Sequence, residues 1–304
     1  MARPYKPMIG AFSHAPAPSR RVIVDPGLLP YRDRAALRIL YRADVATTAQ
    51  LTALVYTRRQ TAQERLSALY RAGYLERAIL PPSTRGGAPY AFRVSPRGRR
   101  RLHYDPLTRA RAGTQLRHSL NGVETVGALV QAGDGSSEPL VQAWLTESMA
   151  QDLLPRTYPD SVVVLQAASG SAVLCLEIDE STERGPVILD KLARYETALH
   201  DRAGWRVLFV AGSAERVASL SRTGRYKGGY AGLAGRAWAL VLPELRTRGL
   251  GAGVVALNPD VARTTLGALL VDPTTRRCPT PVGTDAWLRV LGYFGLEDLD
   301  EALR

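Results

Sequence analysis

The chain has 304 residues, of which 45% are apolar, and a formal net charge of +12. This length allows two domains with sizeable cores, and no uncharged apolar run reaches the roughly 18 residues that a membrane span needs. With no secretory pattern in the first 20 residues and only two cysteines, the sequence predicts a cytoplasmic protein without a disulfide framework or a zinc site.

The charge is unevenly distributed along the chain. Residues 1–111 contain 21 Arg or Lys and 6 Asp or Glu, whereas the rest of the chain contains 19 and 22. A basic excess confined to one segment indicates a polyanion as the partner of that segment, although a merely solvated arginine-rich surface would look the same. Of the 40 basic residues only three are Lys, so positive charge alone is normally supplied by Arg.

The basic segment begins with a predicted flexible basic arm over residues 1–27, which lack hydrophobic periodicity. Residues 28–108 then show the pattern of three helices and a hairpin. The first helix is predicted over 31–42, the second and third are opened by capping boxes at Thr47/Gln50 and Thr57/Gln60, and the strands cover 74–80 and 90–94. This order predicts a winged helix-turn-helix domain.

Side chains suited to bases and phosphates lie on the third helix, at the hairpin tip and in a short following helix. They predict double-stranded DNA as the partner, with a winged helix used for protein contacts as the alternative. The predicted DNA-binding residues are Arg58, Arg59, Gln60, Gln63, Ser67, Arg85, Arg97, Arg99, Arg100 and Arg101.

Residues 109–139 are predicted to be a connecting helix and linker, whose apolar stripe fits either core packing or the seam of a homodimer. Over residues 140–304, strand patterns alternate with helical ones, which predicts a mixed α/β domain with a C-terminal helical extension. The glycine-rich run at 228–235 lacks the preceding strand of a dinucleotide site, so we interpret it as a loop.

Acidic residues gather at the ends of two strands predicted to form a hairpin. Asp160 precedes one strand, whereas Glu177 and Asp179 end its partner and point to the same face. Glu147 ends the preceding predicted strand. Oxygen ligands of this kind can hold Mg²⁺ or Mn²⁺.

The next predicted helix carries Lys191, one of the three lysines. Beside metal-binding carboxylates, a compact ammonium can stabilise charge on a phosphate, which is the inventory of a metal-dependent phosphodiesterase. The alternative is that Lys191 forms a salt bridge with Asp179 or Glu183 and only stabilises the fold.

Together with the predicted winged helix, four short motifs resemble the replication-relaxation family of bacterial plasmids and other mobile elements. They are WLTE at 144–147, YPD at 158–160, LEIDESTE at 176–183 and KLARYE at 191–196. The resemblance implies a C-terminal restriction-endonuclease-like domain, similar to the PD-(D/E)xK nucleases. It assigns metal binding to Asp160 and Glu177, but Asp179 stands where those nucleases have Lys, so Lys191 would have to replace it.

Two functions follow from these observations. The first is a DNA-binding protein of a plasmid or mobile element, acting in replication, relaxation or maintenance alongside replication or transfer proteins, with Asp160, Glu177 and Lys191 as catalytic residues of a Mg²⁺-dependent endonuclease. The alternative is a non-enzymatic winged-helix transcriptional regulator or replication initiator whose C-terminal domain dimerises. The four His residues are scattered, so the pattern does not predict a His-ligated relaxase.

Overall fold

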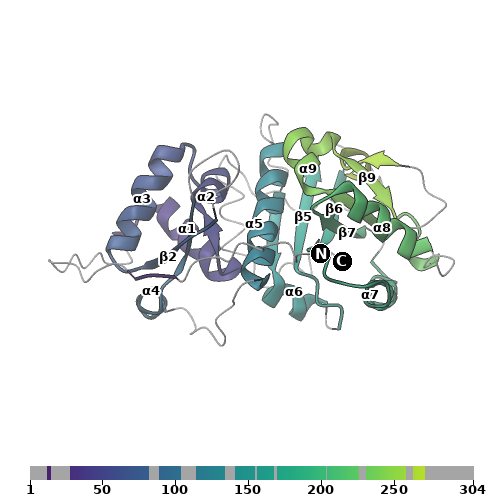
Figure 1. Ribbon diagram of the computed structural model, residues 1–304, viewed down its shortest axis with the longest axis horizontal. Coiled ribbons are helices and arrows are strands. Elements are labelled where there is room, and N and C mark those ends of the chain that lie inside the picture. Colours follow the sequence, from purple (N-terminus) through teal and green to yellow (C-terminus); the bar gives the residue numbers. More distant parts are fainter. Residues whose placement is uncertain are drawn as a thin grey trace, which may run out of the picture. The chain divides into compact units, whose positions relative to one another are not determined.

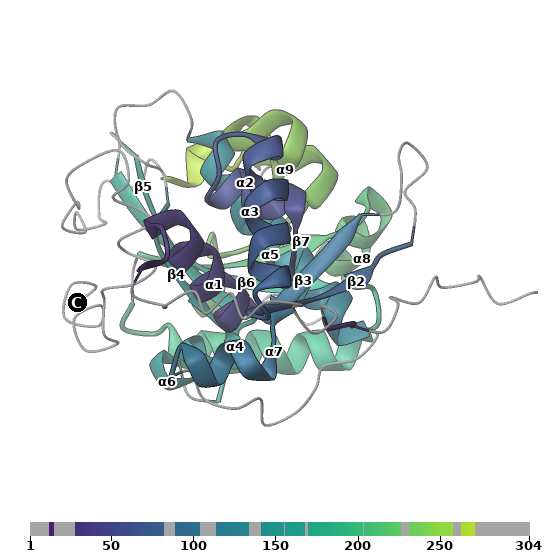
Figure 2. The same ribbon diagram turned by 90° about the vertical axis from the view of Figure 1, so that its left-hand side faces the viewer.

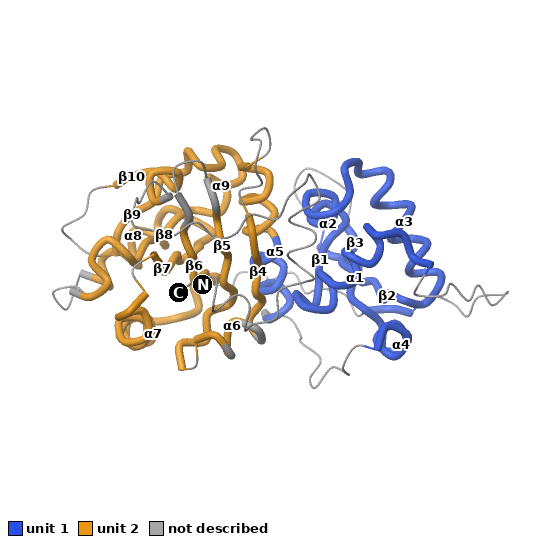
Figure 3. The backbone as a smooth tube through the Cα atoms, turned by 180° about the vertical axis from the view of Figure 1, so that it is seen from behind, with its two compact units in different colours: residues 1–123 blue, residues 124–304 orange. Residues whose placement is uncertain are grey.

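The computed structural model forms two units, residues 1–123 and 124–304 (Figures 1 and 3). The division falls within helix α5 (Thr114–Ala132), inside the segment predicted to connect the domains. The residues that the structure describes are 12–14, 28–81, 89–103, 114–133, 141–154, 156–167, 170–202, 204–225, 231–257 and 263–270. Within these ranges no helix combines the length and apolar character needed to cross a membrane.

Unit 1 contains helices and a small antiparallel sheet in the order predicted from the sequence, with one additional short strand. In the sheet, β3 lies between β1 and β2, and Figure 2 shows β2 and β3 next to each other. The elements are α1 (Tyr31–Ala43), β1 (Ala46–Thr47), α2 (Thr48–Leu54), α3 (Arg59–Arg71), β2 (Leu75–Ile79), β3 (Tyr90–Val94) and α4 (Pro96–Arg101).

The two predicted capping boxes have different outcomes. At α2 the box is confirmed, because the Gln50 amide donates to Thr47 Oγ1 at 3.2 Å and the Thr47 amide donates to Gln50 Oε1 at 2.8 Å. At α3 the prediction is wrong. The helix begins one residue later than Thr57 implies, and its N-cap residue Arg58 makes no capping hydrogen bond through its side chain. A spacing that fits a capping box therefore does not fix the first residue of a helix.

Unit 2 is built on a seven-stranded mixed sheet in the order β10-β9-β8-β7-β6-β5-β4. The pairs β6–β7 and β7–β8 are parallel and the others antiparallel. The strands are β4 (Val141–Thr146), β5 (Ser161–Ala167), β6 (Gly170–Asp179), β7 (Trp205–Ala211), β8 (Ala237–Val241), β9 (Gly253–Ala256) and β10 (Thr264–Thr265).

The principal helices of unit 2 are α6 (Glu147–Leu153), α7 (Gly185–Ala198), α8 (Ala214–Arg225) and α9 (Leu242–Arg248). Short 3-10 turns cover Ala231–Leu233, Gly249–Gly251 and Gly267–Leu270. The predicted mixed α/β class is confirmed. The C-terminal helical extension, in which the apolar pattern predicts a helix over 284–293, has that helix outside the described residues.

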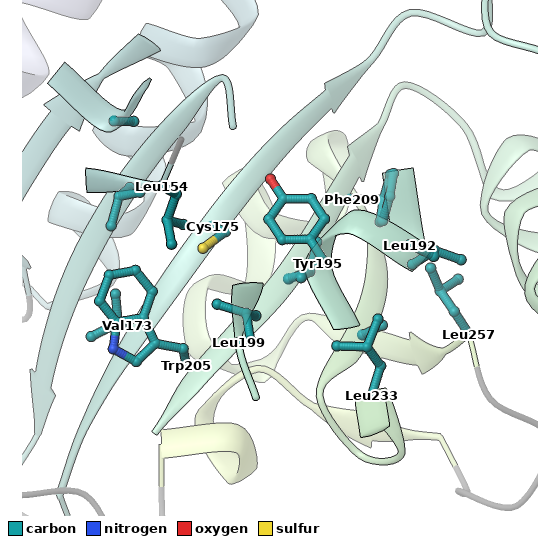
Figure 4. Close-up of a cluster of buried hydrophobic side chains, with 14 of the residues drawn as sticks. Leu154, Val173, Cys175, Leu192, Tyr195, Leu199, Trp205, Phe209, Leu233 and Leu257 are labelled. Carbon is teal, nitrogen blue, oxygen red and sulfur yellow. The ribbon is translucent and has the colours of Figure 1, made fainter. Parts of the chain in front are cut away.

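One hydrophobic cluster fixes which face of β6 carries the acidic side chains. Cys175 of β6 belongs to a buried cluster that also contains Leu192 and Tyr195 of α7 and Phe209 of β7 (Figure 4), together with Leu220 of α8. Because strand side chains alternate between faces, the odd-numbered residues of β6 all lie on the face covered by α7 and α8. The last two odd positions of β6 are therefore held against polar groups of those two helices.

Candidate DNA-binding surface and carboxylate cluster

An ion pair between buried Asp33 and partly exposed Arg65 links α1 to α3 in unit 1. Asp33 of α1 is 1% exposed, and its carboxylate accepts hydrogen bonds at 3.1 Å from the Tyr56 hydroxyl and from Arg65 Nε. The hydrogen bond to Asp33 raises the pKa of the Arg65 guanidinium, while burial raises the pKa of Tyr56. Since Arg65 belongs to α3, this pair holds that side of the helix against α1.

The predicted base-reading residues lie on the exposed side of α3. Gln60 donates a 3.0 Å hydrogen bond to Glu64 one turn later, so an acidic side chain shares this surface. Ser67 is half-buried, whereas the other four predicted residues are exposed: Arg58, Arg59, Gln60 and Gln63. We call the four exposed side chains the α3 surface.

The arginines of α4 do not all face solvent. Arg97 and Arg100 are exposed, while Arg101 Nη1 donates to the Ala72 carbonyl at 3.1 Å. Arg99 is only 4% exposed and lies over the ring of Tyr41, and burial lowers the pKa of its guanidinium. The prediction that Arg99 contacts DNA is therefore wrong, because its side chain packs inside unit 1. Arg85 lies outside the described residues.

Within the predicted arm, Ser13 pairs with the edge of β2, a contact that no sequence pattern indicated. The Ser13 amide donates to the Arg77 carbonyl at 2.8 Å, and the Arg77 amide donates back at 3.1 Å. Next to this bridge, His14 lies 3.0 Å from buried Glu76, which also pairs with Arg93. Residues 12–14 are thus held by backbone and side-chain contacts rather than forming part of a loose arm.

In unit 2 the predicted catalytic residues Asp160, Glu177 and Lys191 come together at the end of β6. The Asp160 amide donates to the Leu176 carbonyl at 3.0 Å, and Asp160 Oδ2 accepts the Ile178 amide at 2.6 Å. Glu177 is 2% exposed, and Lys191 Nζ donates to its Oε2 at 2.7 Å. The β5–β6 hairpin and the first turns of α7 therefore create the expected juxtaposition.

The sequence analysis did not include Tyr195 in this site. Its buried hydroxyl donates to Glu177 Oε1 at 2.6 Å, so both oxygens of that carboxylate have a donor. The available signal was its spacing, since Tyr195 lies four residues after Lys191 on the same helix and so on the same side.

Burial dominates the electrostatics of these groups. It raises the pKa of Glu177 to about 7, and the negative charge of Asp160 adds to this shift, whereas Lys191 and Tyr195 oppose it. Burial raises the pKa of Tyr195 as well. Burial also acts to lower the pKa of Lys191, but the charge of Glu177 and its hydrogen bond outweigh that effect and raise the pKa overall. Glu177 and Lys191 therefore each stabilise the charged form of the other.

Asp179 pairs with Arg216, whereas the sequence predicted a metal ion or Lys191 as its partner. Arg216 of α8 donates to both of its carboxylate oxygens at 2.8 Å, and the Ser181 amide donates to Oδ1 at 2.7 Å. Arg216 also donates to the Glu183 carbonyl at 2.9 Å. Lys191 pairs with the Glu183 side chain at 2.9 Å and with Glu177, so the alternative of a Lys191–Glu183 salt bridge is present and that of a Lys191–Asp179 bridge is not.

We refer to Asp160, Glu177, Asp179 and Glu183 as the carboxylate cluster. Its contacts do not fit the predicted metal site. The predicted ligand Glu147 is the first residue of α6 rather than the last of a strand. No three Asp, Glu, His or Cys side chains within the described ranges are arranged to hold a metal ion.

The occupied oxygens explain this misfit. A divalent ion bound to Glu177 would lie a few Å from the Lys191 ammonium, and their repulsion would be on the order of several kcal/mol. One oxygen of Asp160 is bonded to a backbone amide, and Asp179 already carries a bidentate guanidinium. Two side-chain cations therefore pair with two of the carboxylates that were predicted to bind the metal.

The loops beside the cluster contain unusual backbone. Arg156 and Tyr158 precede Asp160 with φ of 78° and 54°, and Ser181 follows β6 with φ of 61°. Each such conformation is disfavoured for a residue other than glycine, by on the order of 1–3 kcal/mol. Arg194 of α7 supports the first loop by donating to the Arg156 carbonyl at 3.1 Å. The surrounding contacts thus hold both loops in conformations that the chain would not adopt alone.

The family model described as replication-relaxation matches residues 37–208, which is more than half of the chain. The chain belongs to the replication-relaxation family. The matched region includes the α3 surface and the whole carboxylate cluster, and it confirms the resemblance found in the sequence motifs.

Other comparisons add little to this family assignment. No curated protein matches the chain. Among solved structures, the restriction endonuclease FokI is similar over 71% of this chain and 43% of its own, with 13% identity and a TM-score of 0.24. The chain thus spans less than half the length of FokI, and the likeness is too low to support an argument about fold or activity.

Proposed function

We propose that this member of the replication-relaxation family is a DNA-binding protein of a plasmid or other mobile element. In this proposal unit 1 is a winged helix-turn-helix domain whose α3 enters the major groove of duplex DNA. The observation that carries it is the α3 surface, where Arg58, Arg59, Gln60 and Gln63 are all exposed. Arg and Gln are the side chains best suited to bidentate contacts with guanine and adenine, and Arg also pairs with phosphates.

The rigidity of α3 supports this proposal. Base reading requires a helix whose side chains are held at a fixed angle to the groove. The Asp33–Arg65 pair supplies this by tying the opposite side of α3 to α1. The strongly basic composition of residues 1–111 supplies the long-range attraction to a polyanion.

The proposal is tested by titrating full-length protein into labelled duplex oligonucleotides at several salt concentrations. We expect Arg58→Ala/Arg59→Ala to weaken binding and to reduce the slope of log K against log salt by about 2, because each lost phosphate contact removes about one released counterion. The matched control is Arg222→Ala/Arg263→Ala, which removes the same charge from two exposed positions of unit 2.

The control pair should leave affinity and slope close to those of the wild type. If both double variants weaken binding equally, the attraction is a general charge effect and the α3 surface is not the interface. If the wild type binds no duplex even in dilute salt, the proposed function itself is wrong, and a protein partner for this surface becomes the better explanation.

A further inference from the structure

We infer that Lys191 and Arg216 are built-in counterions of the carboxylate cluster, so that this member of the family holds its acidic residues together without a divalent metal. The inference does not depend on DNA binding by unit 1. It starts from the disagreement between the predicted Mg²⁺ site and the contacts that the carboxylates make.

Burial separates the four carboxylates into two classes. The side chains of Glu177 and Asp179 are each 2% exposed, and each pairs with its own cation at 2.7–2.8 Å. Glu183 is 34% exposed and Asp160 is half-buried, so water can solvate part of their charge. Each of the two most buried carboxylates is therefore paired with a side-chain cation, as expected for a charge with little access to water.

Lys191 is a cation that two carboxylates share. Its Nζ is 2.7 Å from Glu177 and 2.9 Å from Glu183, which bridges the end of β6 and the loop that follows it. The neighbouring α7 residues Ile188 and Leu192 are buried in the main hydrophobic cluster, so the helix cannot easily withdraw the ammonium. A compact group with three donors suits this bridging position better than a planar guanidinium, which gives a physical reason for Lys in a chain that otherwise uses Arg.

Arg216 plays the corresponding part at Asp179. Its planar fork matches both carboxylate oxygens, and the same side chain donates to the Glu183 carbonyl. The contacts of Lys191 and Arg216 thus meet at Glu183, one through its side chain and the other through its backbone. Together they connect α7, α8 and the loop after β6 to the acidic end of that strand.

The inference predicts that removing a counterion creates a demand for a metal ion. Without the ammonium, buried Glu177 would lose its cation while the negative charges of Asp160 and Glu183 stay near it, and carboxylate oxygens are the ligands that a hard divalent cation prefers. We therefore expect Lys191→Ala to gain a Mn²⁺ site that the wild type lacks.

The experiment titrates five full-length proteins with Mn²⁺ alone: the wild type, Lys191→Ala, Glu177→Gln, Lys191→Ala/Glu177→Gln and the control Arg222→Ala. The melting temperature and the electron paramagnetic resonance signal of free Mn²⁺ are followed. We expect saturable stabilisation of Lys191→Ala by about 5 °C, and none in the other four proteins. The control removes one exposed positive charge from the same unit and corrects for a general change in net charge.

A saturable Mn²⁺ site in the wild type that disappears in Glu177→Gln would overturn the inference, as would Mg²⁺-dependent DNA nicking that is lost in both Asp160→Ala and Glu177→Ala. A folded Lys191→Ala that gains no Mn²⁺ site would also overturn it. If Lys191→Ala does not fold, the wild-type titration with its Glu177→Gln partner still decides the question. None of these outcomes alters the duplex-binding test of the α3 surface, so the two ideas fail separately.

Discussion

Replacing Arg216 by Met tests whether Asp179 is a structural ion-pair partner. The substitution keeps much of the aliphatic stem but removes the guanidinium that donates to both oxygens of Asp179. Removing one partner of a buried ion pair typically costs about 3–5 kcal/mol, since the other charge stays buried and unpaired. Arg216 is 16% exposed and Asp179 keeps the Ser181 amide as a donor, so we expect a loss near the lower end, about 3 kcal/mol.

For a domain of this size, about 3 kcal/mol corresponds to a melting temperature lower by roughly 10 °C. The assay is urea and thermal unfolding of the full chain, with Arg222→Met as a matched control on an exposed position of the same helix. Adding Asp179→Asn to Arg216→Met should restore part of the loss, because the unpaired charge is then gone. Equal losses in Arg216→Met and Arg222→Met would refute the assignment.

Three further predictions concern stability. Gly224→Ala should lower the free energy of unfolding by about 1–3 kcal/mol, because its new Cβ would lie 2.4 Å from the Leu257 carbonyl oxygen after β9. The control Gly212→Ala should be nearly neutral in the same denaturant assay, because nothing lies within 4 Å of the new Cβ. Tyr195→Phe should cost about 1–3 kcal/mol at pH 8 and less at pH 5, because it removes the donor to the charged form of Glu177; an equal loss at both pH values would contradict this. Burial raises the pKa of Glu177 from 4.5 to about 7, so folding favours its protonated form. The free energy of unfolding of the wild type should therefore fall relative to that of Glu177→Gln, by about 1–3 kcal/mol, as the pH rises through this interval. Denaturant unfolding at several pH values measures this difference.

The elements of unit 1 could be predicted because their signals are local. Apolar residues at helical spacing, the capping box at Thr47 and the glycine after α3 each depend on neighbours within a few residues. Gly73 has φ of 78° and its amide donates to the Tyr70 carbonyl, as expected of a residue that ends a helix. The buried position of Arg99 was not predictable in this way, because it depends on Tyr41, which is distant in the sequence.

The carboxylate cluster shows the same boundary between local and distant information. The hairpin and strand alternation correctly placed Asp160 near Glu177, and the helix that follows brings Lys191 to the same carboxylate, as predicted. The pairing of Asp179 could not be derived, because Arg216 belongs to a helix reached only after the chain crosses from β6 to parallel β7. A pattern of acidic residues thus predicts that charge will gather, but the identity of the neutralising cation depends on tertiary packing.

The two counterions differ in whether the matched part of the family model covers them. Lys191 lies within the matched residues 37–208 together with both carboxylates that it bridges, whereas Arg216 lies beyond them. The bridge through Lys191 is therefore made entirely of residues in the region that defines the family likeness, and the pair with Asp179 is completed from outside it. Family members with Glu, Glu and Lys at the positions of Glu177, Glu183 and Lys191 should share the bridge whatever follows β7. In such a member, a saturable Mn²⁺ site in the unmodified protein would show that the ammonium does not replace the metal.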